Sequence, residues 1–119
     1  MAERSLASAL ADAWDGVRST VRGQRNFQIQ LAIAVAAIVV ASLARFDAVR
    51  WAVLAVTIGL VLTAELANTA LERAVDCAST ETSAAARAAK HAGAGAVLAA
   101  AVTALGVGVA LFGPLLLHR

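Results

Sequence analysis

Four polar side chains recur at helical spacing within a segment that is otherwise mostly apolar. The segment spans residues 64–76 and reads AELANTALERAVD, with Glu65, Asn68, Glu72 and Asp76 as the recurring polar members. Their separations of three, four and four residues place them within an arc of roughly 80° on one helix face. The sequence therefore predicts a ridge of three carboxylates and one amide, which we call the acidic ridge.

An ionised carboxylate near hydrocarbon costs roughly a few kcal/mol, so it needs a partner or a function. Lys90 and His91 stand where a following helix begins, and they can meet the acidic ridge. Mg²⁺ prefers a couple of carboxylates together with phosphate oxygens. Phosphoryl transfer requires positioning, charge neutralisation and a base for the attacking hydroxyl. We interpret the ridge as a site for Mg²⁺ and phosphate; the alternative is a structural salt-bridge seam between helices.

Several other classes of protein are excluded by the sequence. It has no P-loop and no glycine-rich kinase loop, so any nucleotide site must be built from helices. The basic residues are dispersed and aromatic residues make up only 4% of the chain, which argues against nucleic-acid binding. Cys77 is the single cysteine, so no disulfide framework is expected.

The composition is that of a membrane protein. Hydrophobic residues make up 61% of the 119-residue chain and charged residues only 15%, whereas ordinary soluble domains are about half apolar and about a quarter charged. Three stretches carry at most one charge, and each is long enough for the roughly 20 residues of a transmembrane helix: 26–44, 51–71 and 92–117. We expect one all-α membrane domain over 1–119, with transmembrane helices at 27–45, 50–76 (extending into the cytoplasm) and 84–117.

A further helix is predicted at residues 5–22. Its apolar residues form a single stripe at helical spacing, namely Leu6, Leu10, Trp14, Val17 and Val21. Such a helix is expected to lie in the membrane interface with Trp14 at the level of the lipid headgroups. The alternative is an amphipathic helix that packs on its own protein.

The connections between the spans differ in length. The short connection 45–50 predicts an antiparallel hairpin, whereas residues 77–90 form a longer polar link with a turn at 77–83. Thr82 or Ser83 is the expected N-cap of the last helix. That helix is rich in small residues, which let transmembrane helices approach closely, and we expect a homo-oligomer.

The distribution of Lys and Arg predicts the orientation in the membrane. Seven lie on the side of the N-terminus and the 77–90 link, and three lie on the other side. The positive-inside rule then places the N-terminus in the cytoplasm. We expect a multi-pass protein of the cytoplasmic (inner) membrane, with the acidic ridge on the side where ATP is available.

The chain resembles the small prokaryotic integral-membrane lipid kinases, the diacylglycerol kinase and undecaprenol kinase family. The resemblance covers nearly the whole chain and is most specific in the motif E-x-x-N-T-A-x-E-x-x-x-D of the acidic ridge. It continues in A-W-D-G-V at residues 13–17, R-N-F at 25–27 and A-A-K-H-A-G-A-G-A-V-L at 88–98.

This resemblance implies a homotrimer with active sites shared between neighbouring subunits at the cytoplasmic interface. It implies Mg²⁺ as the cofactor and ATP as the phosphoryl donor to a membrane lipid hydroxyl. By the same resemblance, Glu65 is the general base, Asn68 orients the site and Glu72 binds Mg²⁺. Asp76 lies on the nucleotide side, and Lys90 contacts the phosphates.

Two positions depart from the family pattern. Gln24 stands where the family usually has a glutamate that shares Mg²⁺ with Glu72, so its carbonyl oxygen offers a neutral ligand. His91 stands beside Lys90 where the family has an aspartate of the nucleotide site, so the local charge differs. We expect a divergent active kinase.

Within the kinase hypothesis, diacylglycerol and undecaprenol are both candidate lipids. The motifs Q-R-N-F and N-T-A resemble those of the undecaprenol branch more than those of the diacylglycerol branch. The alternatives to an active kinase are a catalytically impaired protein of this fold and a non-enzymatic membrane assembly protein whose ridge holds subunits in register. A proton or cation pathway is disfavoured because the interiors of the first and third spans contain no ionisable groups.

Overall fold

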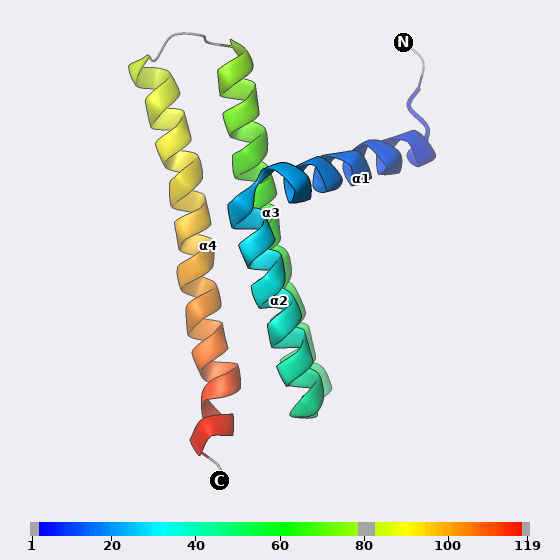
Figure 1. The fold of residues 1–119 in the computed structure, drawn as a ribbon, viewed down its shortest axis with the longest axis vertical. Coiled ribbons are helices and arrows are strands. Elements are labelled where there is room, and N and C mark those ends of the chain that lie inside the picture. Colours follow the sequence, from blue (N-terminus) through cyan, green and yellow to red (C-terminus); the bar gives the residue numbers. More distant parts are fainter. Residues whose placement is uncertain (1–2, 79–82, 118–119) are drawn as a thin grey trace.

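The computed structural model describes residues 3–78 and 83–117, and this part of the chain is folded into four helices. Helices α2 (Arg25–Leu43), α3 (Ala48–Ala78) and α4 (Ala84–Leu117) run roughly alongside one another, and α1 (Leu6–Gly23) extends sideways from them (Figure 1). The all-helical class with three candidate membrane spans is confirmed.

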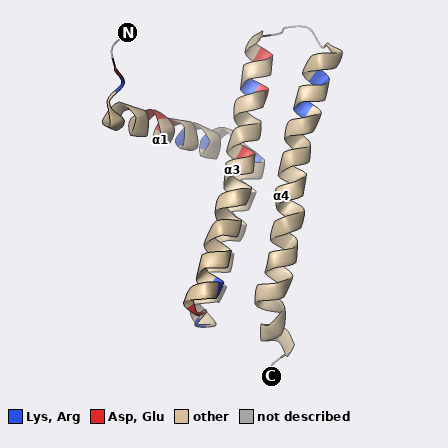
Figure 2. Ribbon diagram, turned by 180° about the vertical axis from the view of Figure 1, so that it is seen from behind, with Lys and Arg blue, Asp and Glu red and all other residues tan. Residues whose placement is uncertain are grey.

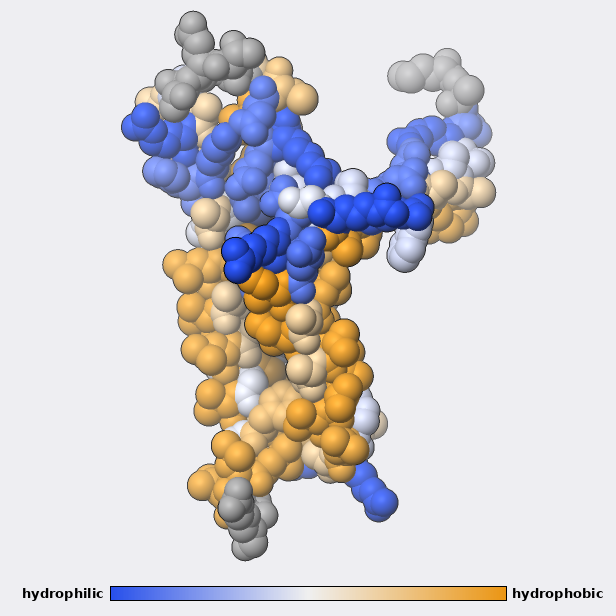
Figure 3. Space-filling model, viewed as in Figure 1, coloured by the Kyte–Doolittle hydropathy of each residue, from blue (hydrophilic) through white to orange (hydrophobic). Residues whose placement is uncertain are grey.

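The lengths of the three long helices differ in a way that positions the site. Helix α2 has 19 residues, about 28 Å, which matches the hydrocarbon thickness of a bilayer. Helices α3 and α4 have 31 and 34 residues, so each exceeds that thickness by roughly 15–20 Å. Their excess length projects past α1 as a charged end, and the remainder forms an apolar band (Figures 2 and 3). We call this charged end the polar end of the bundle.

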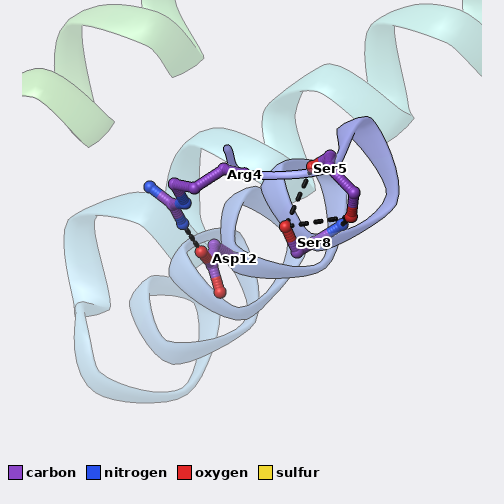
Figure 4. A network of polar contacts seen from close by, with 4 residues as sticks. All are labelled: Arg4, Ser5, Ser8 and Asp12. Atoms are coloured by element: carbon purple, nitrogen blue, oxygen red, sulfur yellow. Dashed lines mark hydrogen bonds and ion pairs between the residues drawn. The ribbon is translucent and has the colours of Figure 1, made fainter. Parts of the chain in front are cut away.

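Helix α1 begins with a local polar network (Figure 4). The Ser5 hydroxyl accepts a hydrogen bond from the Ser8 backbone N–H at 3.1 Å, as an N-cap does. Arg4, which precedes the helix, pairs with Asp12 two turns further on. The helix ends at Gly23, because Gln24 has extended backbone angles (φ −120°, ψ 109°) that redirect the chain into α2.

The apolar stripe of α1 is covered only near the C-terminal end of the helix. Leu6, Leu10 and Trp14 are 77%, 62% and 65% exposed, whereas Val17 and Val21 are half-buried against the bundle. The apolar side of α1 lies at the upper limit of the apolar band (Figure 3). This arrangement fits a helix lying in the membrane interface, so the alternative of packing on the chain itself holds only for the last turns.

The polar link differs in part from the predicted turn. Helix α3 continues through Cys77 to Ala78, so these two positions of the expected 77–83 turn are helical. The Ser83 hydroxyl accepts the Ala86 backbone N–H at 3.0 Å, and Ser83 is therefore an N-cap of α4. The other candidate cap, Thr82, and the rest of that turn lie outside the described residues.

The opposite end of the bundle is closed by an aromatic cluster. Arg45 adopts a left-handed conformation (φ 56°) in the α2–α3 turn, and Phe46 is buried beside Ala41 of α2 and Leu54 of α3. The Phe46 ring lies 5.3 Å from that of Phe112 in α4, centroid to centroid. The three transmembrane helices are thus joined at the end distant from the acidic ridge.

We expect Ala41→Leu to destabilise the protein, because Ala41 is fully buried (0% exposed) and overpacking a close-packed core costs about 1–3 kcal/mol. Thermal unfolding in detergent would measure the change. Ala36→Leu, which makes the same change at an exposed alanine of α2, is the matched control. Equal melting temperatures for the two variants would contradict the packing described at Ala41.

Candidate active site

The acidic ridge runs along α3 from the interior of the bundle to the polar end. Glu65 is buried (5% exposed) and shares a stripe with Leu54, Val61 and Thr69, the other buried residues of α3. Asn68 and Glu72 are half-buried, and Asp76 is exposed. Exposure therefore increases along the ridge, with the most enclosed carboxylate about 16 Å from the most exposed.

The middle of the ridge is held by a hydrogen bond. The Asn68 Nδ2 donates to Glu72 Oε1 at 3.4 Å, a long bond between residues one turn apart. The other end of the carboxamide, Oδ1, is buried and has no hydrogen-bond partner among the described residues. This carbonyl oxygen lies against Gly93 of α4. The Asn68 carboxamide, which is predicted to orient the site, is thus packed between α3 and α4.

At the polar end, the two long helices are joined by an ion pair. Lys90 Nζ of α4 lies 2.6 Å from Asp76 Oδ1 of α3, as expected from the position of Lys90 at the start of the last helix. Both side chains remain open to solvent, at 41% and 65% exposure. Lys90 is therefore accessible to an anionic ligand from the polar end.

The salt-bridge seam alternative accounts for only part of the ridge. Of its three carboxylates, only Asp76 has an ion-pair partner within the described residues. Glu65 and Glu72 are on the same helix as each other and receive no cation there. A purely structural seam would pair the most buried charge first, because its desolvation is the most costly. Within the described residues of the single chain, Glu65 has no such partner.

Two of the predicted site residues are not joined to the ridge. Gln24 lies at the corner between α1 and α2, where its backbone N–H donates to Thr20 O at 2.9 Å. His91 follows Lys90 on α4 and is exposed. Among the described residues, no hydrogen bond or ion pair connects either side chain to Glu72 or Asp76.

One contact near the ridge does not follow from the sequence pattern. The Arg73 Nη1 donates to Ser19 Oγ at 3.2 Å and so links α3 to α1 directly beside Glu72 in the chain. A second bond at the same corner runs from Gln28 Nε2 to the carbonyl oxygen of Val21 at 2.7 Å. These bonds brace α1 against the bundle. Because Arg73 and Ser19 are 54 residues apart, no local sequence pattern predicts their contact.

The donors of the ridge suit a magnesium ion that arrives with phosphates. Within the described residues, no three His, Cys, Asp or Glu side chains converge on one point. Mg²⁺ commonly keeps several waters and uses only one or two carboxylates together with phosphate oxygens. The Glu72 carboxylate, held by an amide at the edge of the solvent-exposed end, fits this mode of binding. It does not form a complete all-protein metal cage.

Comparison with known proteins finds a matching family and related proteins. The family model for prokaryotic diacylglycerol kinase matches residues 11–112, which include the whole acidic ridge and Lys90. A diacylglycerol kinase from Synechocystis sp. is 46% identical over 106 residues, which are 88% of this chain and 61% of that protein. An undecaprenol kinase from Bacillus subtilis is 37% identical over 99 residues, or 83% of this chain and 80% of that protein.

The chain thus spans about three fifths of the length of the Synechocystis protein and four fifths of the Bacillus protein. The match extends from residue 11, in the first half of α1, to Phe112 of the aromatic cluster, so it includes parts of all four helices. On the family match and the described helices together, this chain belongs to the prokaryotic diacylglycerol kinase family.

Proposed function

We propose that this protein transfers the γ-phosphoryl group of ATP to the hydroxyl of a membrane lipid, with Mg²⁺, at the cytoplasmic face of the inner membrane. The observation that carries the proposal is the graded exposure of the acidic ridge. One carboxylate is buried in the bundle, and the others continue along α3 to an accessible lysine. A lipid hydroxyl and a water-soluble nucleotide can therefore meet along one helix face.

Glu65 is the general base in this proposal. Its carboxylate takes the proton from the lipid hydroxyl as the hydroxyl oxygen bonds to the γ-phosphorus. The bond from that phosphorus to the bridging oxygen breaks, and ADP leaves. A positioned base typically contributes about 10²–10⁴-fold to the rate. Glu65 suits this role because it is buried (5% exposed) on a transmembrane helix.

The other ridge residues hold the nucleotide. Glu72, with the carbonyl oxygen of Gln24, would hold Mg²⁺, and Asn68 orients the Glu72 carboxylate. When bound, the ion neutralises negative charge on the phosphate oxygens. Lys90 exchanges its Asp76 partner for phosphate oxygens, which leaves Asp76 free on the nucleotide side. His91 lies beside Lys90 and borders the nucleotide.

The acceptor is the hydroxyl of an apolar lipid, either diacylglycerol or undecaprenol. One relative is named a diacylglycerol kinase and the other an undecaprenol kinase. Both lipids present an alcohol at the membrane surface. We further propose a homotrimer with active sites shared between subunits. Large apolar side chains on α4, including Leu98, Val102 and Leu105, are exposed in the single chain and are available to lipid or to a neighbouring subunit.

A catalytically impaired protein of the same fold, acting in membrane assembly, is the second candidate. It is favoured by one specific observation: Gln24 and His91 replace two carboxylates of the family pattern, and neither side chain is bonded to the ridge within the described residues. The two candidates predict different results in a direct assay.

We expect the purified protein in detergent to transfer label from γ-³²P-labelled ATP to diacylglycerol or to undecaprenol when Mg²⁺ is present. Chelation of Mg²⁺ should abolish the transfer, because without the cation the Glu72 carboxylate and the phosphate oxygens carry like charges and repel each other. Thin-layer chromatography of the two lipids, assayed separately, identifies the acceptor. Absence of label in both lipids at every Mg²⁺ concentration would favour the impaired protein.

We expect Glu65→Gln to lower the turnover number by at least about 100-fold, because the amide cannot accept the hydroxyl proton. The measurement is the same label transfer, with the oligomer monitored by size-exclusion chromatography. Asp15→Asn removes one negative charge from the exposed face of α1 and is the control. An intact oligomer with undiminished activity would remove Glu65 from catalysis, whereas a dissociated oligomer would indicate a structural role for Glu65.

We expect Gln24→Glu to reduce the Mg²⁺ concentration needed for half-maximal activity by several-fold, because a carboxylate binds Mg²⁺ more strongly than a neutral carbonyl oxygen. A Mg²⁺ titration at saturating ATP measures this change. Asn26→Asp, at an exposed position two residues further along the chain, introduces the same charge as a control. An equal shift in both variants would show a general electrostatic effect and would remove Gln24 from the metal site.

A further inference from the structure

A side chain at residue 93 of α4, which is a glycine, would displace side chains of α3. A Cβ built on Gly93 would collide with Oδ1 of Asn68 and would lie 2.8 Å from Cδ2 of Leu71, both on α3. At the other seven glycines, nothing among the described residues lies within 4 Å of such an atom. Gly93 is thus the one glycine of the chain whose missing side chain allows two helices to meet closely.

The close approach of α3 gives a physical reason for a glycine at residue 93, which the open surroundings of Gly95 do not give there. The neighbouring positions of α4 are mostly alanines, which are better helix formers than glycine. A glycine weakens the helix wherever it stands, and at residue 93 the close approach to α3 offsets that cost. The required approach is to the carboxamide of Asn68, which lies on the acidic ridge.

The contact orients the Asn68 carboxamide. With Oδ1 turned toward the Gly93 Cα, Nδ2 is left to donate to the Glu72 carboxylate. The opposite orientation would place Oδ1 beside that carboxylate and bury the amide N–H groups without an acceptor. The oxygen instead receives at most a weak Cα–H contact from the glycine. A methyl group at residue 93 would displace the carboxamide and, with it, the bond to Glu72.

We infer that Gly93 is a positioning residue of the active site, which acts through Asn68 to hold the Glu72 carboxylate in place for the nucleotide. The role of Gly93 in catalysis rests on the proposed function. Its role in orienting the Asn68 carboxamide rests on the contact between α3 and α4 alone. An apolar, uncharged position of α4 is thereby given a role in phosphoryl transfer.

The direct test observes the Asn68 carboxamide itself. The chain contains two asparagines, Asn26 and Asn68, so ¹⁵N-asparagine labelling gives two side-chain amide signals. Asn26 is exposed and serves as an internal reference. We expect Gly93→Ala to shift the Asn68 signal and leave that of Asn26 unchanged. The matched control, Gly95→Ala, adds a methyl group in open space two residues further along α4 and should move neither signal.

Activity is the second readout. Gly93→Ala should lower the turnover number about 10- to 100-fold, since a displacement of about 1 Å near a site can cost up to ~100-fold. Gly95→Ala should retain the wild-type rate. In the Asn68→Ala background, Gly93→Ala should cost little further, because the carboxamide that it displaces is gone.

The possible outcomes separate the inference from the proposed function. An unshifted Asn68 signal, or an equal loss of activity from Gly93→Ala with and without the Asn68 carboxamide, would overturn the positioning role. Wild-type protein that labels neither lipid would overturn the proposed function. In that case, the nitrogen signals alone would still decide whether Gly93 fixes the carboxamide.

Discussion

The structure depends on keeping a carboxylate, Glu65, inside a helix that crosses the membrane. Burying an unpaired charge is costly, and Glu65 is only 5% exposed with no cationic partner in the described residues. The chain confines this cost to one position. Further along the ridge, Asn68 and Glu72 are half-buried and Asp76 is exposed at the polar end, where Lys90 of α4 pairs with it. The ridge therefore connects the apolar band to water without placing a second charge in the hydrocarbon.

The geometry of the ridge in turn depends on how α3 and α4 meet. In a bilayer there is no hydrophobic force between helices, so close packing of small residues and a few polar contacts hold them together. Here, Gly93 and Ala100 are the buried residues of α4, and the Phe46–Phe112 contact closes the far end. The ion pair between Lys90 and Asp76 fixes the near end. The helices are joined at both ends, with Asn68 held between them.

The sequence predicted the features that follow from composition and periodicity. Apolar stretches of sufficient length predicted the three spans, and the spacing of Glu65, Asn68, Glu72 and Asp76 predicted a single ridge, because both depend only on local helix geometry. The contact of Gly93 with Asn68 and the bond from Arg73 to Ser19 were not predicted. Many small residues of α4 have equivalent sequence surroundings, and only the rotation of α4 against α3 decides which one is buried.

The single chain encloses Glu65 but leaves the outer half of the ridge open. Glu72 is half-buried and Asp76 exposed, whereas phosphoryl transfer benefits from a site that excludes water around the reacting groups. In the described residues, Gln24 and His91 do not close this side. The nucleotide and lipid, or another subunit, would supply the missing wall. A neighbouring subunit in the proposed homotrimer would supply it and would also cover apolar residues of α4, so assembly and completion of the site would be the same event.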